Sequence, residues 1–419
     1  KYKPDHIDHS IIDSIISIAS YSQQKLTIEE CYALAEKNYP LAKQINLLQQ
    51  KSTYEIDALN KAKLPKIDLN AQATYQSDVI GLPTTLPGVE SLNKDQYRAT
   101  LDVNQLLYNG GMIAANTKLK EAQTLTQQQQ VEVNLYQLKS RINYSYMMIL
   151  LWQDQRELLF AKQNTIYSKI KEVKSGVKNG AILPASEQVL EAELLKLEQA
   201  LTENSFQRIK EIQNLSSLTT TTIAENAVLE RPITAFKANG TRPEIKFFDL
   251  QQDQIEASKN IIAKSNSPKL NAFGQAGYGN PGLNMLNNSF EDFYIVGLKL
   301  NWNVLDWNKS KTDKQALDIA KEVVATEKET FETNNQMQLN ELQSEISKIE
   351  IIIKTDSQII HLREKVVQSS DSQLRNGVIT SSDYITELNQ LFDAKTNQKV
   401  HQTQLELAKI NYQTIKGTH

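Results

Sequence analysis

The residue types that carry catalysis or hold metals are few and scattered in this chain of 419 residues. Its five histidines are His6, His9, His361, His401 and His419. None has the HExxH or CxxC companions of a metal site, and the sequence contains no GxGxxG, P-loop or GxSxG motif. The lone Cys31 lies in a helix-like segment, which excludes an internal disulfide and favours a buried apolar residue over a reactive thiol. We therefore expect no catalytic residue, no metal site, no cofactor and no enzymatic activity.

Two carboxylates near the end of the chain have a spacing that matters for a helix. Thr380 and Asp383 form the pattern of a capping box, in which Asp383 stabilises the start of its own helix. Glu387 follows one helical turn later and would lie on the same helix face as Asp383. The capping box alone is enough to explain an aspartate at this position. Any further role of Asp383 depends on what its helix faces.

The composition excludes two classes of function. The net charge is -3 and the isoelectric point is about 6.1, so the chain has no electrostatic signature of nucleic-acid binding. The longest apolar run, from Tyr146 to Trp152, is far shorter than the roughly 18 residues that a membrane-spanning helix needs. The sequence therefore excludes a helical membrane protein, and its sparse glycine and proline are typical of long helices.

The chain is built from two copies of one pattern. Pro40 and Pro65 are 25 residues apart, and so are Pro243 and Pro268. Matching residues of the two copies are 203 positions apart up to the tyrosine of the first strand, and 197 positions apart after the tyrosine of the second strand. The whole length difference therefore lies in the short segment between these two tyrosines. A segment that changes length while its flanks do not is a surface loop.

Within each copy the hydrophobic period changes from helical to alternating. Alternation over about ten residues predicts strands at 66–77, 96–108, 269–279 and 292–305, broken only by Gln105 and Phe273. Near the middle of the apolar face we expect Leu69, Leu101, Leu298 and Leu300. At the loop end, an aromatic girdle would comprise Tyr75, Tyr97, Tyr278 and Tyr294.

A half-buried sheet in a soluble domain would show the same alternation. Three details favour a sheet that faces lipid: its apolar face carries no charge, its polar face carries residues such as Asp102 and Lys299, and the tyrosines lie at one end. Strands of this length cross hydrocarbon when they are tilted. Because four strands cannot close a membrane barrel, such a chain must oligomerise.

A long helical hairpin follows each strand pair. The first arm of each hairpin has about 66 residues without proline, roughly 100 Å of helix at 1.5 Å per residue. The arms stop at the helix-ending pairs Asn179-Gly180 and Asn376-Gly377. Start signals for the returning helices follow at Pro184 and at Thr380.

In these features the chain resembles the TolC-like outer membrane efflux protein family. The resemblance rests on the opening from Leu26 to Ala35, the helix starts at Asn38–Pro40 and Arg242–Glu244, the turn Leu107–Gly111 and the two Asn-Gly tips, in the same order twice over. It implies a mixed α and β membrane protein: a homotrimer whose 12-stranded outer membrane β-barrel continues into a long periplasmic α-helical barrel, with two structural repeats per chain. The implied function is the exit duct of a tripartite efflux or type I secretion system, a passive conduit from the periplasm of a Gram-negative bacterium to the exterior.

The resemblance also assigns roles to residues. It implies that a periplasmic adaptor protein, working with an inner membrane transporter, docks at the hairpin tips Asn179, Gly180, Asn376 and Gly377. Gly110 and Gly111 would bend the chain at the junction of barrel and tunnel, where the second copy has Trp307 and Asn308, so we expect the two junctions to differ in geometry. Asp383 stands where the family places a pore-facing aspartate, so Asp383 and Glu387 would form rings of carboxylates at the periplasmic aperture. The other expected partners are outer membrane lipid and two further copies of the chain, and not nucleic acid.

The expected division of the chain follows the repeats. We expect an N-terminal equatorial segment with a first helix (1–39), repeat 1 (40–215, with the hairpin 112–215), an inter-repeat equatorial linker (216–242) and repeat 2 (243–416, with the hairpin 309–416). The alternative reading is a periplasmic adaptor or a structural coiled-coil protein, but adaptors have one hairpin and compact β modules. The sequence does not distinguish drug, metal or protein as the exported cargo.

Overall fold

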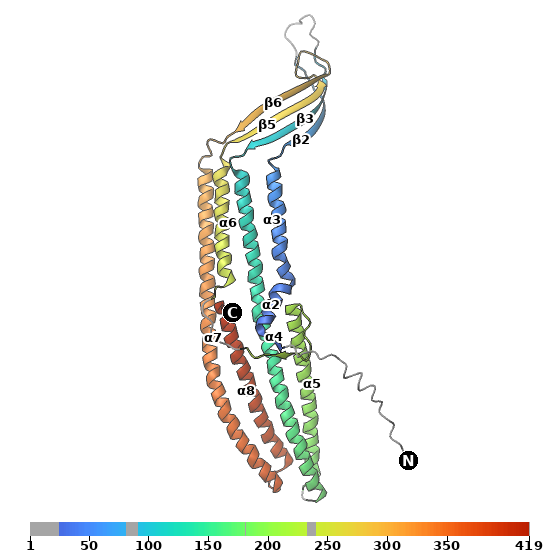
Figure 1. Ribbon diagram of the computed structural model, residues 1–419, viewed down its shortest axis with the longest axis vertical. Coiled ribbons are helices and arrows are strands. Elements are labelled where there is room, and N and C mark those ends of the chain that lie inside the picture. Colours follow the sequence, from blue (N-terminus) through green and yellow to red (C-terminus); the bar gives the residue numbers. More distant parts are fainter. Residues whose placement is uncertain (1–24, 81–90, 181, 233–239, 419) are drawn as a thin grey trace, which may run out of the picture. The chain divides into compact units, whose positions relative to one another are not determined.

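The computed structural model describes residues 25–80, 91–180, 182–232 and 240–418 (Figure 1). Long helices and one sheet dominate. In chain order the elements are β1 (Lys25–Leu26), α2 (Ile28–Asn38), the short 3-10 helix η1 (Pro40–Ala42), α3 (Lys43–Lys61), β2 (Lys66–Tyr75), β3 (Asp95–Tyr108), α4 (Met112–Lys178), α5 (Ala185–Thr219), β4 (Val228–Leu229), α6 (Pro243–Ser265), β5 (Lys269–Asn280), β6 (Glu291–Asn301), α7 (Lys309–Arg375) and α8 (Ser381–Lys416).

The chain divides into two compact units that do not coincide with the two sequence repeats. The sheet unit comprises residues 43–131 and 244–331, and the hairpin unit comprises the described residues within 1–42, 132–243 and 332–419. Each repeat therefore contributes to both units. The division into repeats remains a description of the sequence, and we describe each unit separately.

The sheet unit contains the four predicted strands as one antiparallel sheet in the order β2-β3-β5-β6. Leu69 lies opposite Leu101, Leu101 opposite Ala276, and Ala276 opposite Tyr294. The two copies therefore join through β3 and β5. The outer edges of the sheet are β2 and β6.

Strand boundaries differ slightly from those expected. β2 ends at Tyr75 and not at residue 77, and β6 ends at Asn301 and not at residue 305. Residues 302–305 leave the ladder because β5 begins only at Lys269, which lies opposite Asn301 and leaves nothing beyond it to pair with. Part of the first expected loop, residues 81–90, lies outside the described residues.

Helices of the sheet unit lead into the strands and continue from them. Figure 1 shows α3, α6 and the first parts of α4 and α7 meeting the sheet at the same end. The helix whose start the sequence places at Pro40 begins as a 3-10 turn and ends at Lys61. Hydrogen bonds join neighbouring helices: the Gln128 amide donates to the Ile45 carbonyl (3.1 Å) and the Thr126 hydroxyl to the Leu250 carbonyl (3.2 Å).

The hairpin unit is anchored by the apolar run of α4 that begins at Tyr146. Tyr146, Met147 and Ile149 are fully buried. The Tyr146 hydroxyl lies 2.7 Å from the carbonyl oxygen of Leu26 and 2.6 Å from that of Glu230, which holds α4 against the short parallel pair of β1 and β4. Cys31 is buried in the same region, and burial raises the pKa of its thiol to about 12, which confirms the prediction of an unreactive cysteine.

Both helical hairpins of this unit share an apolar core. Its buried members come from α4, α5, α7 and α8: Ile166, Ile170, Val173, Leu190, Leu197, Leu374, Tyr384, Ile385 and Leu388. The returning helix α5 runs to Thr219, four residues beyond the expected end of the hairpin. The helix continues because Leu218 and Thr219 are buried and the Thr219 hydroxyl donates to the Leu215 carbonyl (2.9 Å). Of the helices in the described part of the chain, none has a stretch long and apolar enough to cross a membrane.

Candidate functional site

One face of the sheet is largely apolar and mostly exposed. Leu69, Leu101, Leu298 and Leu300 all lie on this apolar face and are all exposed. Asp95 and Asp292 are the charged residues that share this face, and each lies two residues beyond a tyrosine, toward the loops. Between the tyrosines and the helices, the face carries no charge.

Gln105, the polar residue that interrupts the apolar face, is there to bond nearby backbone groups. Gln105 pairs with Ala272 and so lies on the apolar face. Its amide nitrogen donates to the carbonyl oxygens of Lys63 (2.5 Å) and Leu106 (3.1 Å). The side chain thus satisfies backbone groups near the helix junction, where the ladder of β2 has not yet begun.

The opposite, polar face is linked by hydrogen bonds to one carboxylate. The amides of Asn70 (2.6 Å) and Gln275 (2.5 Å) and the hydroxyl of Thr100 (3.0 Å) all donate to Asp102. Three strands are thereby joined side chain to side chain. Asp102 was predicted on this face, but its partners follow from the register and not from the sequence.

The aromatic residue on the polar face covers a glycine. Phe273 lies opposite Gly297, where an added Cβ would lie 2.8 Å from the ring. Phe293 covers Gly277 in the same way, at 2.6 Å. These rings fill the space that the glycines leave on the sheet, which explains why Phe273 departs from the alternation.

The four tyrosines form a diagonal across the sheet and not a row. Tyr75 lies opposite Asp95, and Tyr97 on the same strand is displaced by two residues toward the helices. Tyr278 and Tyr294 are each displaced by two more residues in the same direction. Two residues span about 6.6 Å along a strand, and neighbouring strands are about 4.8 Å apart. The four tyrosines would therefore lie at one height along an axis to which the strands are inclined by roughly 54°.

The two strand-to-helix junctions share a left-handed turn, although β3 continues to Tyr108 before its turn whereas β6 already ends at Asn301. Gly110 and Gly111 have φ of +67° and +81°, and Trp307 and Asn308 have φ of +53° and +65°. All four residues are left-handed. Glycine adopts this conformation without strain, asparagine tolerates it, and tryptophan rarely does.

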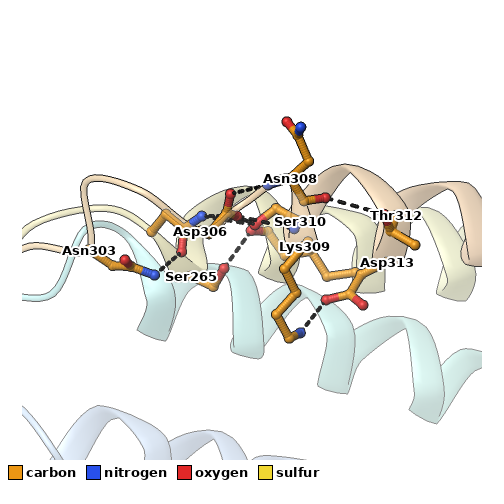
Figure 2. A network of polar contacts seen from close by, with 10 residues as sticks. Ser265, Asn303, Asp306, Asn308, Lys309, Ser310, Thr312 and Asp313 are labelled. Carbon is orange, nitrogen blue, oxygen red and sulfur yellow. Dashed lines mark hydrogen bonds and ion pairs between the residues drawn. The ribbon is translucent and has the colours of Figure 1, made fainter.

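A network of polar contacts around Asp306 stabilises the second junction (Figure 2). The Asp306 carboxylate accepts hydrogen bonds from the backbone N–H groups of Asn308 (3.1 Å) and Ser310 (3.1 Å) and from the side chains of Ser310 (2.5 Å) and Asn266 (2.5 Å). These donors, with the Ser310 hydroxyl first, lower the pKa of Asp306 to about 2. The carboxylate caps the first turn of α7 and holds the left-handed turn in place.

The predicted hairpin tips lie where each long helix ends. Gly180 and Gly377 both have φ of +71°, and nothing lies near the Cβ that a larger residue would add. Glycine is therefore required by the backbone and not by crowding. Asn179 and Asn376 are exposed beside them, and so are the apolar side chains of Leu183 and Val378, which the sequence reading did not single out.

Asp383 forms the capping box that the sequence predicts. Its backbone N–H donates to the Thr380 hydroxyl (3.2 Å), and its carboxylate accepts from the Thr380 backbone N–H (2.9 Å) and hydroxyl (2.7 Å). The hydrogen bond from the Thr380 side chain, followed by that from its backbone, lowers the pKa of Asp383. Capping therefore favours the ionised form of Asp383 at the start of α8.

Glu387 has a partner that sequence reasoning missed. The guanidinium of Arg363 on α7 lies 3.1 Å from the Glu387 carboxylate on α8. Its charge is thus offset within one chain, whereas that of Asp383 is not. A second ion cluster near the tips joins the hairpins: Lys169 on α4 pairs with Asp371 on α7, and Arg375 bonds Glu172 (2.9 Å).

Residues that hold metals are not brought together. Within the described residues, no three His, Cys, Asp or Glu side chains are placed to bind one ion. Of the described histidines, His401 contacts Asp356 at 2.6 Å between α8 and α7, a pair inside the second hairpin.

The described residues thus form a sheet with a largely apolar, exposed face and two helical hairpins that share one core. Comparisons with known proteins agree with this geometry. The family described as outer membrane efflux protein matches residues 31–221, so this part of the chain is similar to that family. No curated protein matches the chain.

Solved structures of outer membrane channels share the fold over nearly the whole chain. A structure of CusC, described for its transmembrane channel formation, is 10% identical with a TM-score of 0.67, covering 94% of this chain and 92% of that one. The outer membrane protein VceC of Vibrio cholerae is 14% identical, with a TM-score of 0.64 and coverage of 93% and 96%. The open-state MtrE channel of Neisseria gonorrhoeae is 13% identical, with a TM-score of 0.64 and coverage of 93% and 89%.

Proposed function

We propose that three copies of this chain form an outer membrane channel, the exit duct of a tripartite efflux or type I secretion system in a Gram-negative bacterium. The sheet of each copy contributes four strands to a shared 12-stranded barrel, and the helices form a periplasmic tunnel. The duct is a passive conduit, so a transporter in the inner membrane and a periplasmic adaptor supply energy and cargo.

The single observation that carries this proposal is the sheet with two open edges and one exposed apolar face that carries no charge between its tyrosines and the helices. Backbone groups at the edges of β2 and β6 have no partner within the sheet. In hydrocarbon each unsatisfied group costs several kcal/mol, so the edges must pair with other copies. Three copies give twelve strands, within the range of 8 to 26 found in outer membrane barrels.

The height of the apolar face supports a membrane position. Eleven residues separate Tyr97, on the tyrosine diagonal, from Tyr108 at the end of β3. Eleven residues are about 36 Å of strand, or about 21–26 Å of height for strands inclined by roughly 54° to 45°. The apolar band of outer membrane barrels is about 25 Å tall. The tyrosine diagonal and Tyr108 thus fit the two rims of one band.

The helical part suits a tunnel with a charged end. Twelve helices in a ring, about 10 Å apart, would enclose a bore of roughly 28 Å. Asp383 would contribute three ionised carboxylates at the aperture, and Glu387 would contribute less because Arg363 offsets it. At the tips, Asn179, Gly180, Asn376 and Gly377, with exposed Leu183 and Val378, would form the surface that the adaptor contacts.

The test of the proposal is the mass of the detergent-solubilised protein together with its conductance. Light scattering corrected for detergent should give three times 47.5 kDa, and the same fraction should form water-filled pores in planar bilayers. A dispersed, stable monomer would refute the barrel, because a single four-stranded sheet cannot satisfy its edges in lipid.

A further inference from the structure

The four junctions between strands and helices gather lysines. Across residues 61–66, 107–114, 264–269 and 302–314 there are two carboxylates, Asp306 and Asp313, against eight lysines. The lysines are Lys61, Lys63, Lys66, Lys264, Lys269, Lys309, Lys311 and Lys314. All lie in the sheet unit, at the end where the helices meet the strands (Figure 1).

Three of these lysines are exposed and have no carboxylate partner. Lys61 pairs with Asp57 (2.6 Å) and Lys309 with Asp313 (2.5 Å). Lys66 and Lys269 belong to the polar face of the sheet. By contrast, among the described residues no carboxylate pairs with the exposed side chains of Lys63, Lys264 and Lys311, which we call the junction lysines.

Helix stability accounts for only one of the junction lysines. Lys264 lies in the last turn of α6, where a cation is favourable, with its side chain over Gly111. Lys63, however, lies beyond the end of α3, where its ammonium bonds only the Asn60 side chain (3.0 Å). Lys311 lies in the first turn of α7, where the helix dipole disfavours a cation. An external anion would satisfy all three.

The apolar band ends at the level of these lysines. Counting eleven residues from each tyrosine of the diagonal, as from Tyr97 to Tyr108, leads to Leu64, Ser267 and Leu305, which lie just beyond the helix-side ends of β2, β5 and β6. Leu64, Tyr108 and Leu305 are each more than half exposed. The junction lysines follow within six residues of these positions on the helix side. This is the level of lipid headgroups next to a hydrocarbon core.

Exposed tryptophans at the same level add a second sign of a lipid interface. Trp302 and Trp307 flank Leu305 in the connection from β6 to α7, and Trp307 is 85% exposed in its left-handed conformation. Tryptophan is enriched at the boundary between hydrocarbon and headgroups. Lysine beside it reaches the headgroup phosphates while its stem stays on the apolar side.

We propose that the junction lysines bind the headgroups of anionic phospholipids in the periplasmic leaflet of the outer membrane. The inference rests on the proposed trimeric barrel, because it needs the sheet in a membrane with its helices on the periplasmic side. Each copy supplies three ammonium groups at three junctions, so the trimer carries a ring of nine. The attraction favours an anionic lipid over a zwitterionic one and weakens with salt.

The experiment uses delipidated trimer titrated with phosphatidylglycerol or phosphatidylcholine, with bound lipids counted by native mass spectrometry. Wild-type trimer should retain phosphatidylglycerol preferentially, and inorganic phosphate should not displace it. Lys63→Gln together with Lys264→Gln should reduce the preference about fivefold per lysine removed. Lys63→Arg with Lys264→Arg should keep the preference, because the positive charge remains.

A matched control has the same charge change on the same helices. Lys43 and Lys246 are exposed near the far ends of α3 and α6, roughly 27 Å from Lys61 and Lys264 at 1.5 Å per residue. Lys43→Gln with Lys246→Gln should leave the lipid preference unchanged.

Three results would overturn the proposal. Equal retention of the two lipids by wild type would remove the headgroup site, and an unchanged preference in the Lys63→Gln, Lys264→Gln variant would place it elsewhere. If that variant assembles poorly in both lipids alike, the lysines pair with carboxylates of a neighbouring copy, and the single Lys63→Gln trimer would then show no loss of preference. A wild-type chain that never trimerises would instead refute the proposed function itself.

Discussion

Leu69 and Asn70 are neighbours on β2 that lie on opposite faces of the sheet, so arginine at each position tests which face meets lipid. Leu69 pairs with Leu101 on the apolar face, and Asn70 pairs with Thr100 on the polar face beside Asp102. Leu69→Arg buries a guanidinium in hydrocarbon if the proposed barrel is correct. Asn70→Arg places the same group in the water-filled lumen, next to a carboxylate.

The expected cost follows from the depth of Leu69. Six residues separate Leu69 from Tyr75, about 20 Å of strand and about 12–14 Å of height for inclined strands. Half of an apolar band about 25 Å tall is a similar distance, so Leu69 lies near the midplane. Arginine there costs about 2–4 kcal/mol per copy, or about 6–12 kcal/mol per trimer, whereas lumen substitutions are tolerated.

The assay is the midpoint temperature of trimer dissociation, followed by the shift from trimer to monomer on semi-native gels after heating. Leu69→Arg should lower the midpoint strongly or prevent assembly, and Leu298→Arg should do the same from β6. Asn70→Arg should assemble at wild-type yield. Equal defects for Leu69→Arg and Asn70→Arg would refute the assignment of the faces, because the two residues are adjacent and differ only in the side to which they point.

Three further predictions concern caps and the aperture. Thr380→Ala should destabilise the start of α8 by about 0.5–2 kcal/mol, seen as faster hydrogen exchange of its first turn. Arg363→Gln should raise cation selectivity in planar bilayers by freeing Glu387, and Asp383→Asn should lower it; unchanged reversal potentials in both would contradict the pore role. Asp306→Ala should fray the start of α7. Because the folded pKa of Asp306 is depressed to about 2, its stabilisation is complete above the unfolded pKa near 4 and is lost as the pH falls toward 2, which exchange measurements at pH 5 and pH 2 would detect.

The sheet could be predicted from the sequence because side chains alternate strictly along a strand. Leu69 and Leu101 lie on one face as expected, and only the register was missing. Register depends on pairing between strands far apart in the chain, such as β3 with β5. The sequence alone did not show why Gln105 and Phe273 depart from the alternation. Gln105 donates to the Lys63 carbonyl, and Phe273 covers Gly297 on the paired strand β6.

The similarity of the two junctions was not predictable from residue types alone. Gly110-Gly111 signals a left-handed turn directly, whereas Trp307-Asn308 argues against one. The second turn is held by side-chain hydrogen bonds to Asp306, including one from Asn266, which is 40 residues away. Such support depends on the packing of α6 beside α7. A local signal did exist, because an aspartate can accept from the backbone N–H two residues on, as Asp306 does from Asn308.

The ion-pair partner of Glu387 could have been predicted by counting residues from the hairpin tip along both arms. In an antiparallel hairpin, residues at similar distances from the turn lie beside each other. Arg363 is 14 residues before Gly377 and Glu387 is 10 after it, and they form an ion pair. The same count links Asp356, 21 residues before the tip, with His401, 24 after it. Charged residues on the two arms should therefore be read as pairs before any of them is assigned to a pore.

When Asp383 is read in the same way, its charge is not offset by an ion pair across the hairpin among the described residues. Its capping hydrogen bonds therefore affect its ionisation as well as the stability of the helix. No cation in the described part of the chain pairs with Asp383, and its hydrogen bonds come from the neutral Thr380. These bonds stabilise the carboxylate and lower its pKa, so capping favours the ionised form of Asp383. The structural role and the proposed pore role therefore support each other. A Thr380→Ala channel should remain cation-selective at neutral pH and lose that selectivity at a higher pH than wild type on acidification, whereas a purely structural Asp383 would leave the two selectivity profiles identical.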